Sequence, residues 1–115
     1  EAGAEDVVVW GTGAPRREFL HVDDLADACV FLMGSYSSDE MINVGWGRDI
    51  TIAELADVVK RVTGFEGGIV FDANKPDGTP RKLLDTTKLT NLGWQPGIEL
   101  EDGIAETYRW YQGQL

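Results

Sequence analysis

Five of the ten basic residues in this sequence lie in two short stretches that also carry turn-forming residues. The stretches are KPDGTPRK and GTGAPRR, and their basic residues are Lys75, Arg81, Lys82, Arg16 and Arg17. An arginine can bind two phosphate oxygens at once through its planar guanidinium, whereas a lysine acts as a point charge. Prolines and a glycine restrict the loop, which lowers the entropy cost of holding the cations in place. The two stretches therefore indicate a site for an anionic group.

A second interpretation of the same charges needs no ligand. Both stretches would then be solvated turns, and their cations would pair with nearby acids such as Glu18, Asp72 and Asp85. Composition alone does not decide between the two interpretations. Trp10 adds to the first one, because it stands at the end of a valine run and before a glycine turn, where its ring can lie against a sugar or a base.

Other residues with chemical potential are expected to be structural. His21 is a lone histidine in an apolar segment, and Cys29 lies on the apolar face of an expected helix, so we predict that Cys29 belongs to the core. Most of the four tryptophans are also expected there. The GTG turn after Trp10 is not a dinucleotide fingerprint, because no third glycine opens a following helix. No spacing is typical of metal ligands, so we predict neither a metal nor a cofactor site in these 115 residues.

The bulk composition is that of a globular protein and excludes two classes of partner. The chain has 115 residues, 43% of them hydrophobic, and a net charge of −10. A strongly acidic chain is not attracted to nucleic acid or to anionic membranes, and no apolar run approaches the ~20 residues of a membrane span. The single cysteine fits a reducing cytoplasm. The chain enters a strand-like run almost at once, so we expect a piece of a longer protein.

Apolar spacing predicts alternating strands and helices, which is an α/β class. The expected strands are 7–10, 18–22, 41–45 and 68–71, with a short extended segment at 83–85. The expected helices are 24–33, 52–63, 87–92 and 102–112. Asp23 or Asp24 is expected to cap the first helix. Thr51 and Glu54 form a capping box for the second helix, which should end at Gly64.

Four segments follow one another along the chain: VVVWGTGAPRREFLHVDDLADA, INVGWGRDITIAELA, VFDANKPDGTPRKLLD and LGWQPGIELEDGIAETYRW. Together they resemble the C-terminal part of the GDP-L-fucose synthase family, whose members are extended short-chain dehydrogenases/reductases. The resemblance runs from Val7 to Trp110, nearly the whole chain. REFLHVDD alone would suggest only some nucleotide-sugar epimerase or reductase, whereas KPDGTPRKLLD makes the resemblance specific.

The resemblance implies a function for the longer protein. Enzymes of this family convert GDP-4-keto-6-deoxy-D-mannose to GDP-L-fucose by epimerisation at two carbons and reduction with NADPH. A Rossmann half binds the cofactor, and a C-terminal part binds the GDP-sugar. Residues 1–115 would then be a single C-terminal GDP-sugar-binding domain without the N-terminal Rossmann half. The resemblance assigns substrate contacts to Trp10, Arg17, Asp77 and Lys82: the first two would meet the sugar and diphosphate, Lys82 would add charge, and Asp77 would bind the nucleotide end.

The resemblance also predicts what this chain lacks. No catalytic residue is assigned, because the Tyr-x-x-x-Lys pair and the reductase serine are absent from the sequence. His21 and Cys29 do not match the family's epimerising pair, which lies upstream of the matching region. Arg16 and Trp46 depart from the family pattern, and no role follows for them. We therefore expect an inactive chain, cut from a cytoplasmic and homodimeric parent. The apolar face of helix 24–33 and strand 41–45 is expected to drive self-association of this chain, unless a rearranged N-terminal segment covers it.

Two further interpretations remain open at this point. The chain could come from another nucleotide-sugar epimerase or dehydratase of the same fold, although the complete KPDGTPRK stretch disfavours this. It could also be a free-standing nucleotide-sugar-binding module. If the parent gene encodes a Rossmann half upstream, the chain is part of a larger enzyme and not a free-standing module.

Overall fold

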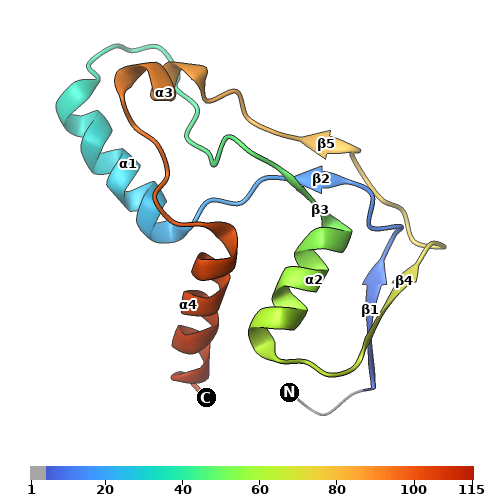
Figure 1. The fold of residues 1–115 in the computed structure, drawn as a ribbon. Coiled ribbons are helices and arrows are strands. Elements are labelled where there is room, and N and C mark those ends of the chain that lie inside the picture. Colours follow the sequence, from blue (N-terminus) through green and yellow to red (C-terminus); the bar gives the residue numbers. More distant parts are fainter. Residues whose placement is uncertain (1–4) are drawn as a thin grey trace.

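The computed structural model describes residues 5–115, within which five strands and four helices alternate in an α/β fold (Figure 1). The fold class therefore agrees with the sequence pattern. The strands are β1 (Asp6–Trp10), β2 (Arg16–Arg17), β3 (Ile50–Thr51), β4 (Gly68–Asp72) and β5 (Arg81–Lys82). The helices are α1 (Val22–Ser35), α2 (Ile52–Thr63), α3 (Thr87–Leu92) and α4 (Leu100–Gln112).

The strands form two small sheets. β1 pairs with β4 in parallel, and this pair is built from the valine-rich run 6–10 and the run 68–72. β2 is the central strand of the second sheet, antiparallel to β3 and parallel to β5. Each of these three strands has only two residues, so backbone pairing alone holds this sheet weakly. Side-chain contacts must supply the rest.

Local signals place α2 and α3 where the sequence predicts them. The Thr51 hydroxyl accepts from the backbone N–H of Glu54 at 3.1 Å, and the Glu54 carboxylate accepts from the backbone N–H of Thr51 at 3.1 Å. The Thr51 hydroxyl also donates to the Glu54 carboxylate at 2.8 Å, and the bonds that this carboxylate accepts, from the Thr51 backbone first and its hydroxyl second, lower the pKa of Glu54. Gly64 and Gly93 end the two helices in the left-handed region. The capping box is therefore confirmed.

The start of α1 differs from the prediction. The helix begins at Val22, and His21 is its N-cap, with Nδ1 accepting from the backbone N–H of Asp23 at 3.0 Å. Asp24 instead accepts from the backbone N–H groups of Gly97 and Ile98, at 3.1 and 3.0 Å. The expected cap by Asp23 or Asp24 is thus wrong, because a loop far along the chain takes the Asp24 carboxylate. His21 is structural, as predicted.

The predicted strands 18–22 and 41–45 are not strands in the structure. The extended chain around Glu18 is held by a side chain in place of a backbone ladder. The Glu18 carboxylate accepts from the backbone N–H groups of Gly47 and Leu84, at 2.8 and 3.0 Å. An alternating apolar pattern indicates which side chains are buried, but not whether the backbone is hydrogen-bonded to a neighbouring strand. It therefore cannot distinguish an extended segment held by side chains from a true strand.

The core is small and lies between α1, α3 and the turn that follows α3. Its buried residues are Ala28, Leu89 and Trp94, and partly buried neighbours pack around them: Leu20, Phe31, Leu32, Ile42 and Val44. The Trp94 indole donates to Asp27 at 2.9 Å. Cys29 is exposed, so its predicted place in the core is wrong. It is next to Ala28, and one residue turns ~100° around a helix, away from the packed side.

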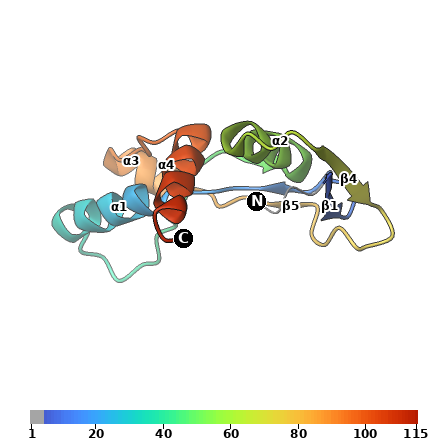
Figure 2. The same cartoon turned by 90° about the horizontal axis from the view of Figure 1, so that it is seen from below.

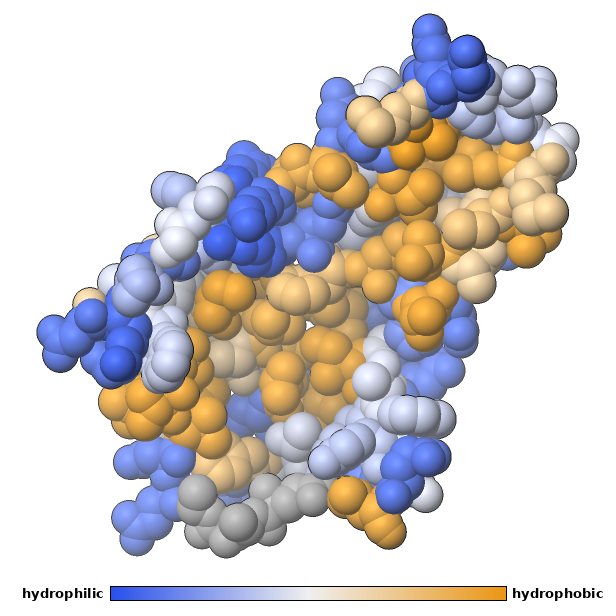
Figure 3. All heavy atoms as spheres, turned by 180° about the vertical axis from the view of Figure 1, so that it is seen from behind, coloured by the Kyte–Doolittle hydropathy of each residue, from blue (hydrophilic) through white to orange (hydrophobic). Residues whose placement is uncertain are grey.

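The molecule is thin, which explains the small core. Its extents are 51 × 34 × 18 Å, and Figure 2 shows helices and strands in one shallow layer. Apolar side chains cover much of one face (Figure 3). Large apolar residues exposed over more than half their surface include Val22, Val30, Met33 and Met41. Two tryptophans, Trp10 and Trp110, are also exposed, contrary to the expectation that most lie in the core. None of the helices within residues 5–115 is long and apolar enough to cross a membrane.

Candidate anion-binding site

The basic residues of the two stretches come together in the pairing of β2 with β5. Arg16 lies opposite Arg81, and Arg17 lies opposite Lys82, in parallel register. We call these four residues the basic ladder. Successive side chains of a strand point to opposite faces of the sheet. Arg16 and Arg81 therefore share one face, and Arg17 and Lys82 share the other.

A buried carboxylate occupies the Arg16 face of the basic ladder. Asp49 accepts from Arg16 Nε at 2.9 Å with one oxygen and from Arg81 Nε at 2.6 Å with the other. Its side chain is only 6% exposed. Burial by itself would raise the pKa of Asp49, but the hydrogen bonds from the two guanidinium groups outweigh it and lower the pKa. Asp49 is therefore an anion at neutral pH.

The acids that the ligand-free interpretation named are committed elsewhere. Glu18 accepts from backbone amides, Asp72 accepts from the backbone N–H of Asn74 at 3.1 Å, and Asp85 accepts from Thr87. The ligand-free interpretation therefore named the wrong acids as partners of the cations. Two of the five cations do pair, but with Asp49, which sequence reasoning missed. Its only sequence signal is an acidic residue just before the Thr51 cap.

The opposite face of the basic ladder presents two cations. Arg17 is partly buried, and its Nη1 donates to the backbone oxygen of its neighbour Arg16 at 2.7 Å, which fixes the direction of the guanidinium. Lys82 is exposed. In the part of the chain that the structure describes, neither forms an ion pair. Two adjacent cations without such an ion pair make this face of the basic ladder the candidate position for an anionic group.

The loop that carries Asp77 closes over the same region. Asp77 accepts from the backbone N–H of Thr12 at 2.6 Å and from the Thr12 hydroxyl at 2.8 Å. The loop continues through Gly78, where a Cβ would lie 3.8 Å from Arg17 Nη2. Gly78 has φ +80°, a conformation that favours glycine. Asp77 therefore fastens the loop to the turn after β1 and brings the backbone of Gly78 close to Arg17.

Trp10 stands at the other side of this loop. Its ring is 70% exposed, and Lys75 Nζ lies 5.0 Å from the ring centroid. A cation at this distance is attracted to the indole face. The contact places a third cation without an ion pair, among the described residues, at the start of the same loop. A series of contacts thus connects the segments that carry the four predicted residues, which are Trp10, Arg17, Asp77 and Lys82.

Arg16 and Trp46, the two residues that depart from the family pattern, also have structural contacts. Arg16 is a partner of Asp49, as described above. Trp46 is partly buried, and the Arg48 guanidinium lies 4.3 Å from its ring centroid. Arg48 in turn pairs with Glu99 at 3.1 Å. Arg16 therefore takes part in a contact between segments, whereas Trp46 contacts Arg48 within its own segment.

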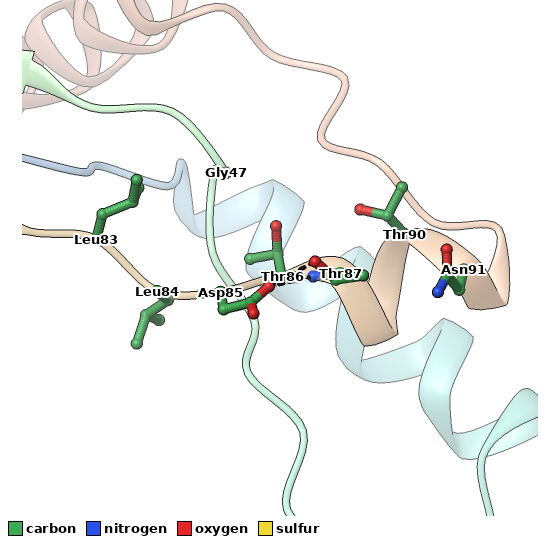
Figure 4. A pocket seen from close by; sticks show the side chains of 8 residues that line it. All are labelled: Gly47, Leu83, Leu84, Asp85, Thr86, Thr87, Thr90 and Asn91. Carbon is green, nitrogen blue, oxygen red and sulfur yellow. Dashed lines mark hydrogen bonds between the residues drawn. The ribbon is translucent and has the colours of Figure 1, made fainter.

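A hollow of about 450 Å³ follows β5, but it does not have the character of an anion site (Figure 4). Leu83 and Leu84 point to opposite sides of the chain there, and Thr86 and its neighbours supply neutral polar groups. The only charged group in its lining is Asp85, which accepts from the hydroxyl and the backbone N–H of Thr87 at 2.6 and 3.0 Å. The basic ladder, not this hollow, is therefore the candidate site.

Two other groupings contain residue types that cofactor and metal sites use. At the GTG turn, a Cβ on Gly11 would collide with the Asp77 carboxylate, so an acid already fills the space beside the turn. The turn therefore does not fit a dinucleotide pyrophosphate. His21, Asp23 and Glu106 have potential ligand atoms within 4.8 Å of one another. His21 Nδ1 caps α1, and its Nε2 lies 3.9 Å from a carboxylate oxygen of Glu106.

Comparisons with known proteins show which proteins this chain resembles. Residues 1–45 match the profile of the NAD dependent epimerase/dehydratase family. GDP-L-fucose synthase 1 of Arabidopsis thaliana is 63% identical over 109 residues, which cover 95% of this chain and 34% of that protein. GDP-L-fucose synthase of Escherichia coli (strain K12) is 53% identical over 117 residues, 94% of this chain and 36% of that protein.

A solved structure shares the fold. The crystal structure of a GDP-L-fucose synthetase from Naegleria fowleri superposes with a TM-score of 0.89 at 32% identity, covering 94% of this chain and 34% of that one. The chain thus spans about a third of the length of the curated relatives it matches. The resemblance seen in the sequence is confirmed: over that third, this chain is a relative of the GDP-L-fucose synthases in both sequence and fold.

Proposed function

We propose that this chain is the GDP-sugar-binding portion of a GDP-L-fucose synthase, and that its full-length parent converts GDP-4-keto-6-deoxy-D-mannose to GDP-L-fucose. The observation that carries the proposal is the side-by-side position of Arg17 and Lys82 on one face of the basic ladder. Neither cation has an acidic partner among the described residues, although the chain has twice as many acids as bases. A diphosphate supplies the missing negative charge.

Each predicted residue has a role in this proposal. The planar guanidinium of Arg17 binds diphosphate oxygens, and Lys82 adds a point charge beside it. The exposed ring of Trp10 provides a flat surface for the sugar. A carboxylate has about four acceptor positions, and Thr12 uses two of those on Asp77. Asp77 therefore retains acceptor capacity for the nucleotide end.

The proposed division of labour leaves the chemistry outside this chain. In the parent, NADPH supplies the hydride for the ketone reduction and binds to the remainder of the protein. This chain contributes the binding and orientation of the GDP-sugar. Both tasks use charge and shape, and neither requires a proton donor or acceptor from residues 1–115.

The first prediction is that residues 1–115 alone show no turnover. Proton and hydride transfer both need groups that this sequence does not carry. The measurement follows NADPH absorbance with the keto-sugar nucleotide, using material free of host enzyme. The full-length parent serves as the positive control, with GDP-L-fucose identified as its product. A parent that folds but leaves the substrate unchanged contradicts the proposed function, and turnover by the isolated chain contradicts the division of labour.

The second prediction is that the isolated chain self-associates. A layer 18 Å thick leaves apolar side chains in water, and large exposed apolar patches drive association. Met33 on α1 is 85% exposed. Sedimentation velocity at tens of micromolar should show dimers or larger species, and Met33→Glu should shift them toward monomer. Gln114→Glu adds the same charge at the C-terminal end and should change little. A wild-type monomer at these concentrations is the contrary result.

A further inference from the structure

We infer that Asp49 is a positioning residue for the GDP-sugar site: its buried carboxylate fixes the geometry of Arg17 and Lys82 from the opposite face of the basic ladder. The inference rests on the proposed function, because it assigns Asp49 a task at that same site. Asp49 itself touches no substrate in this arrangement. It acts through the two strands that carry the binding cations.

The geometry makes Asp49 a bridge between three strands. It directly precedes β3, which pairs with β2, and its two oxygens reach one residue of β2 and one of β5. The residues that it holds, Arg16 and Arg81, are the immediate neighbours of Arg17 and Lys82. Fixing one residue of a two-residue strand fixes the direction of the other, since their side chains alternate.

The charges explain why such a bridge is needed. The basic ladder places four cations in two cross-strand pairs, and like charges directly opposite each other destabilise strand pairing. Asp49 is the acid that the described residues place in hydrogen-bond contact with the ladder. It compensates the pair on its own face and leaves the other pair uncompensated. Without it, mutual repulsion would spread β2 and β5 and move the two binding cations apart.

We expect that a change at Asp49 weakens substrate binding but hardly changes the rate of the chemical step. We would measure kcat and KM of the full-length parent carrying Asp49→Asn, which keeps the shape and removes the charge. We expect KM for the GDP-sugar to rise by roughly 3- to 10-fold with kcat nearly unchanged, because a displaced contact loses uniform binding. Arg81→Gln removes one arm of the bridge from an exposed position and should raise KM by a smaller factor.

Two controls separate positioning from general instability. Thr51→Ala removes the α2 cap and should lower Tm without raising KM. Asp39→Asn removes an acid from an exposed loop position and should alter neither quantity. If Thr51→Ala raises KM as much as Asp49→Asn does, the effect of Asp49 is only structural and the inference is overturned.

A double-mutant cycle provides the decisive test. If Asp49 acts through Arg17, then Asp49→Asn combined with Arg17→Ala should have a KM close to that of Arg17→Ala alone. Fully additive losses would overturn the inference. A damaging Arg17→Ala with a silent Asp49→Asn and a silent Arg81→Gln would reject this inference and leave the proposed function standing. A silent Arg17→Ala would reject the proposed site, and the role of Asp49 with it.

Discussion

Replacing Arg17 with alanine in the full-length parent is expected to lower kcat/KM for the GDP-sugar by roughly 10- to 100-fold. A hydrogen bond to a charged group is typically worth about 1.5–3 kcal/mol, which corresponds to a loss of that size. Arg17 lies on the face of the basic ladder opposite Asp49, forms no ion pair with the described residues, and has its guanidinium oriented by the Arg16 carbonyl. Its side chain supports no core contact, so thermal melts should show a folded protein.

The matched comparison uses its neighbour in the same strand. Arg16→Ala should lower kcat/KM less than Arg17→Ala, because Arg16 points to Asp49 on the other face. Its main cost should be a lower Tm. Arg17→Lys should restore only part of the activity, since an ammonium cannot reproduce the planar fork. If Arg16→Ala is the more damaging change, the assignment of the two faces is wrong. If both changes are silent in a folded enzyme, the diphosphate binds elsewhere.

Elements with local signals could be predicted from the sequence. The capping box of Thr51 and Glu54 joins residues three apart, and Gly64 and Gly93 end helices through their own backbone conformations. Such signals need no knowledge of distant segments. For the same reason α2 and α3 begin and end where predicted, and the valine run becomes β1.

Features that depend on distant segments could not be predicted in this way. Asp49 is 33 residues from Arg16 and 32 from Arg81 in sequence, and its role exists only because β2, β3 and β5 meet. The Asp24 carboxylate is used by a loop 73 and 74 residues away, which left the capping of α1 to His21. A local pattern offers acids and histidine as possible caps, but it cannot show which of them another segment will occupy.

The candidate site was predictable in its residues and not in its geometry. The resemblance pointed to Trp10, Arg17, Asp77 and Lys82, and their roles in substrate binding stay predictions. The structure adds that Arg17 and Lys82 are in register and that Asp77 is fastened to Thr12. Successive side chains of a strand point to opposite faces, which places Arg16 and Arg17 on different faces of the sheet. This rule could be used only once β2 was known to be a strand.

Leu89→Ala is expected to destabilise the small core strongly. Leu89 is 1% exposed and packs in the cluster with Ala28 and Trp94. Truncating a buried leucine typically costs about 2–5 kcal/mol, because the transfer free energy is lost and a cavity is left. A whole domain is stable by only about 5–15 kcal/mol. A core with so few fully buried side chains has little packing elsewhere to compensate for such a loss.

Leu92→Ala is the matched control, because the same truncation falls in the same helix at a side chain that is 37% exposed. Its cost should stay below about 1 kcal/mol, as is usual for surface positions. Urea unfolding of residues 1–115 is followed by circular dichroism at one fixed concentration at which sedimentation shows monomer, and the midpoints at a common m-value give the two free energies. Helix propensity changes equally in both variants, so the difference between them isolates burial. Equal costs for the two leucines would mean that the cluster around Leu89 does not hold α1 and α3 together. A cost above 2 kcal/mol for Leu89→Ala alone would show that this cluster stabilises the half of the layer that carries α1, even though the strands of the basic ladder contribute no residue to it.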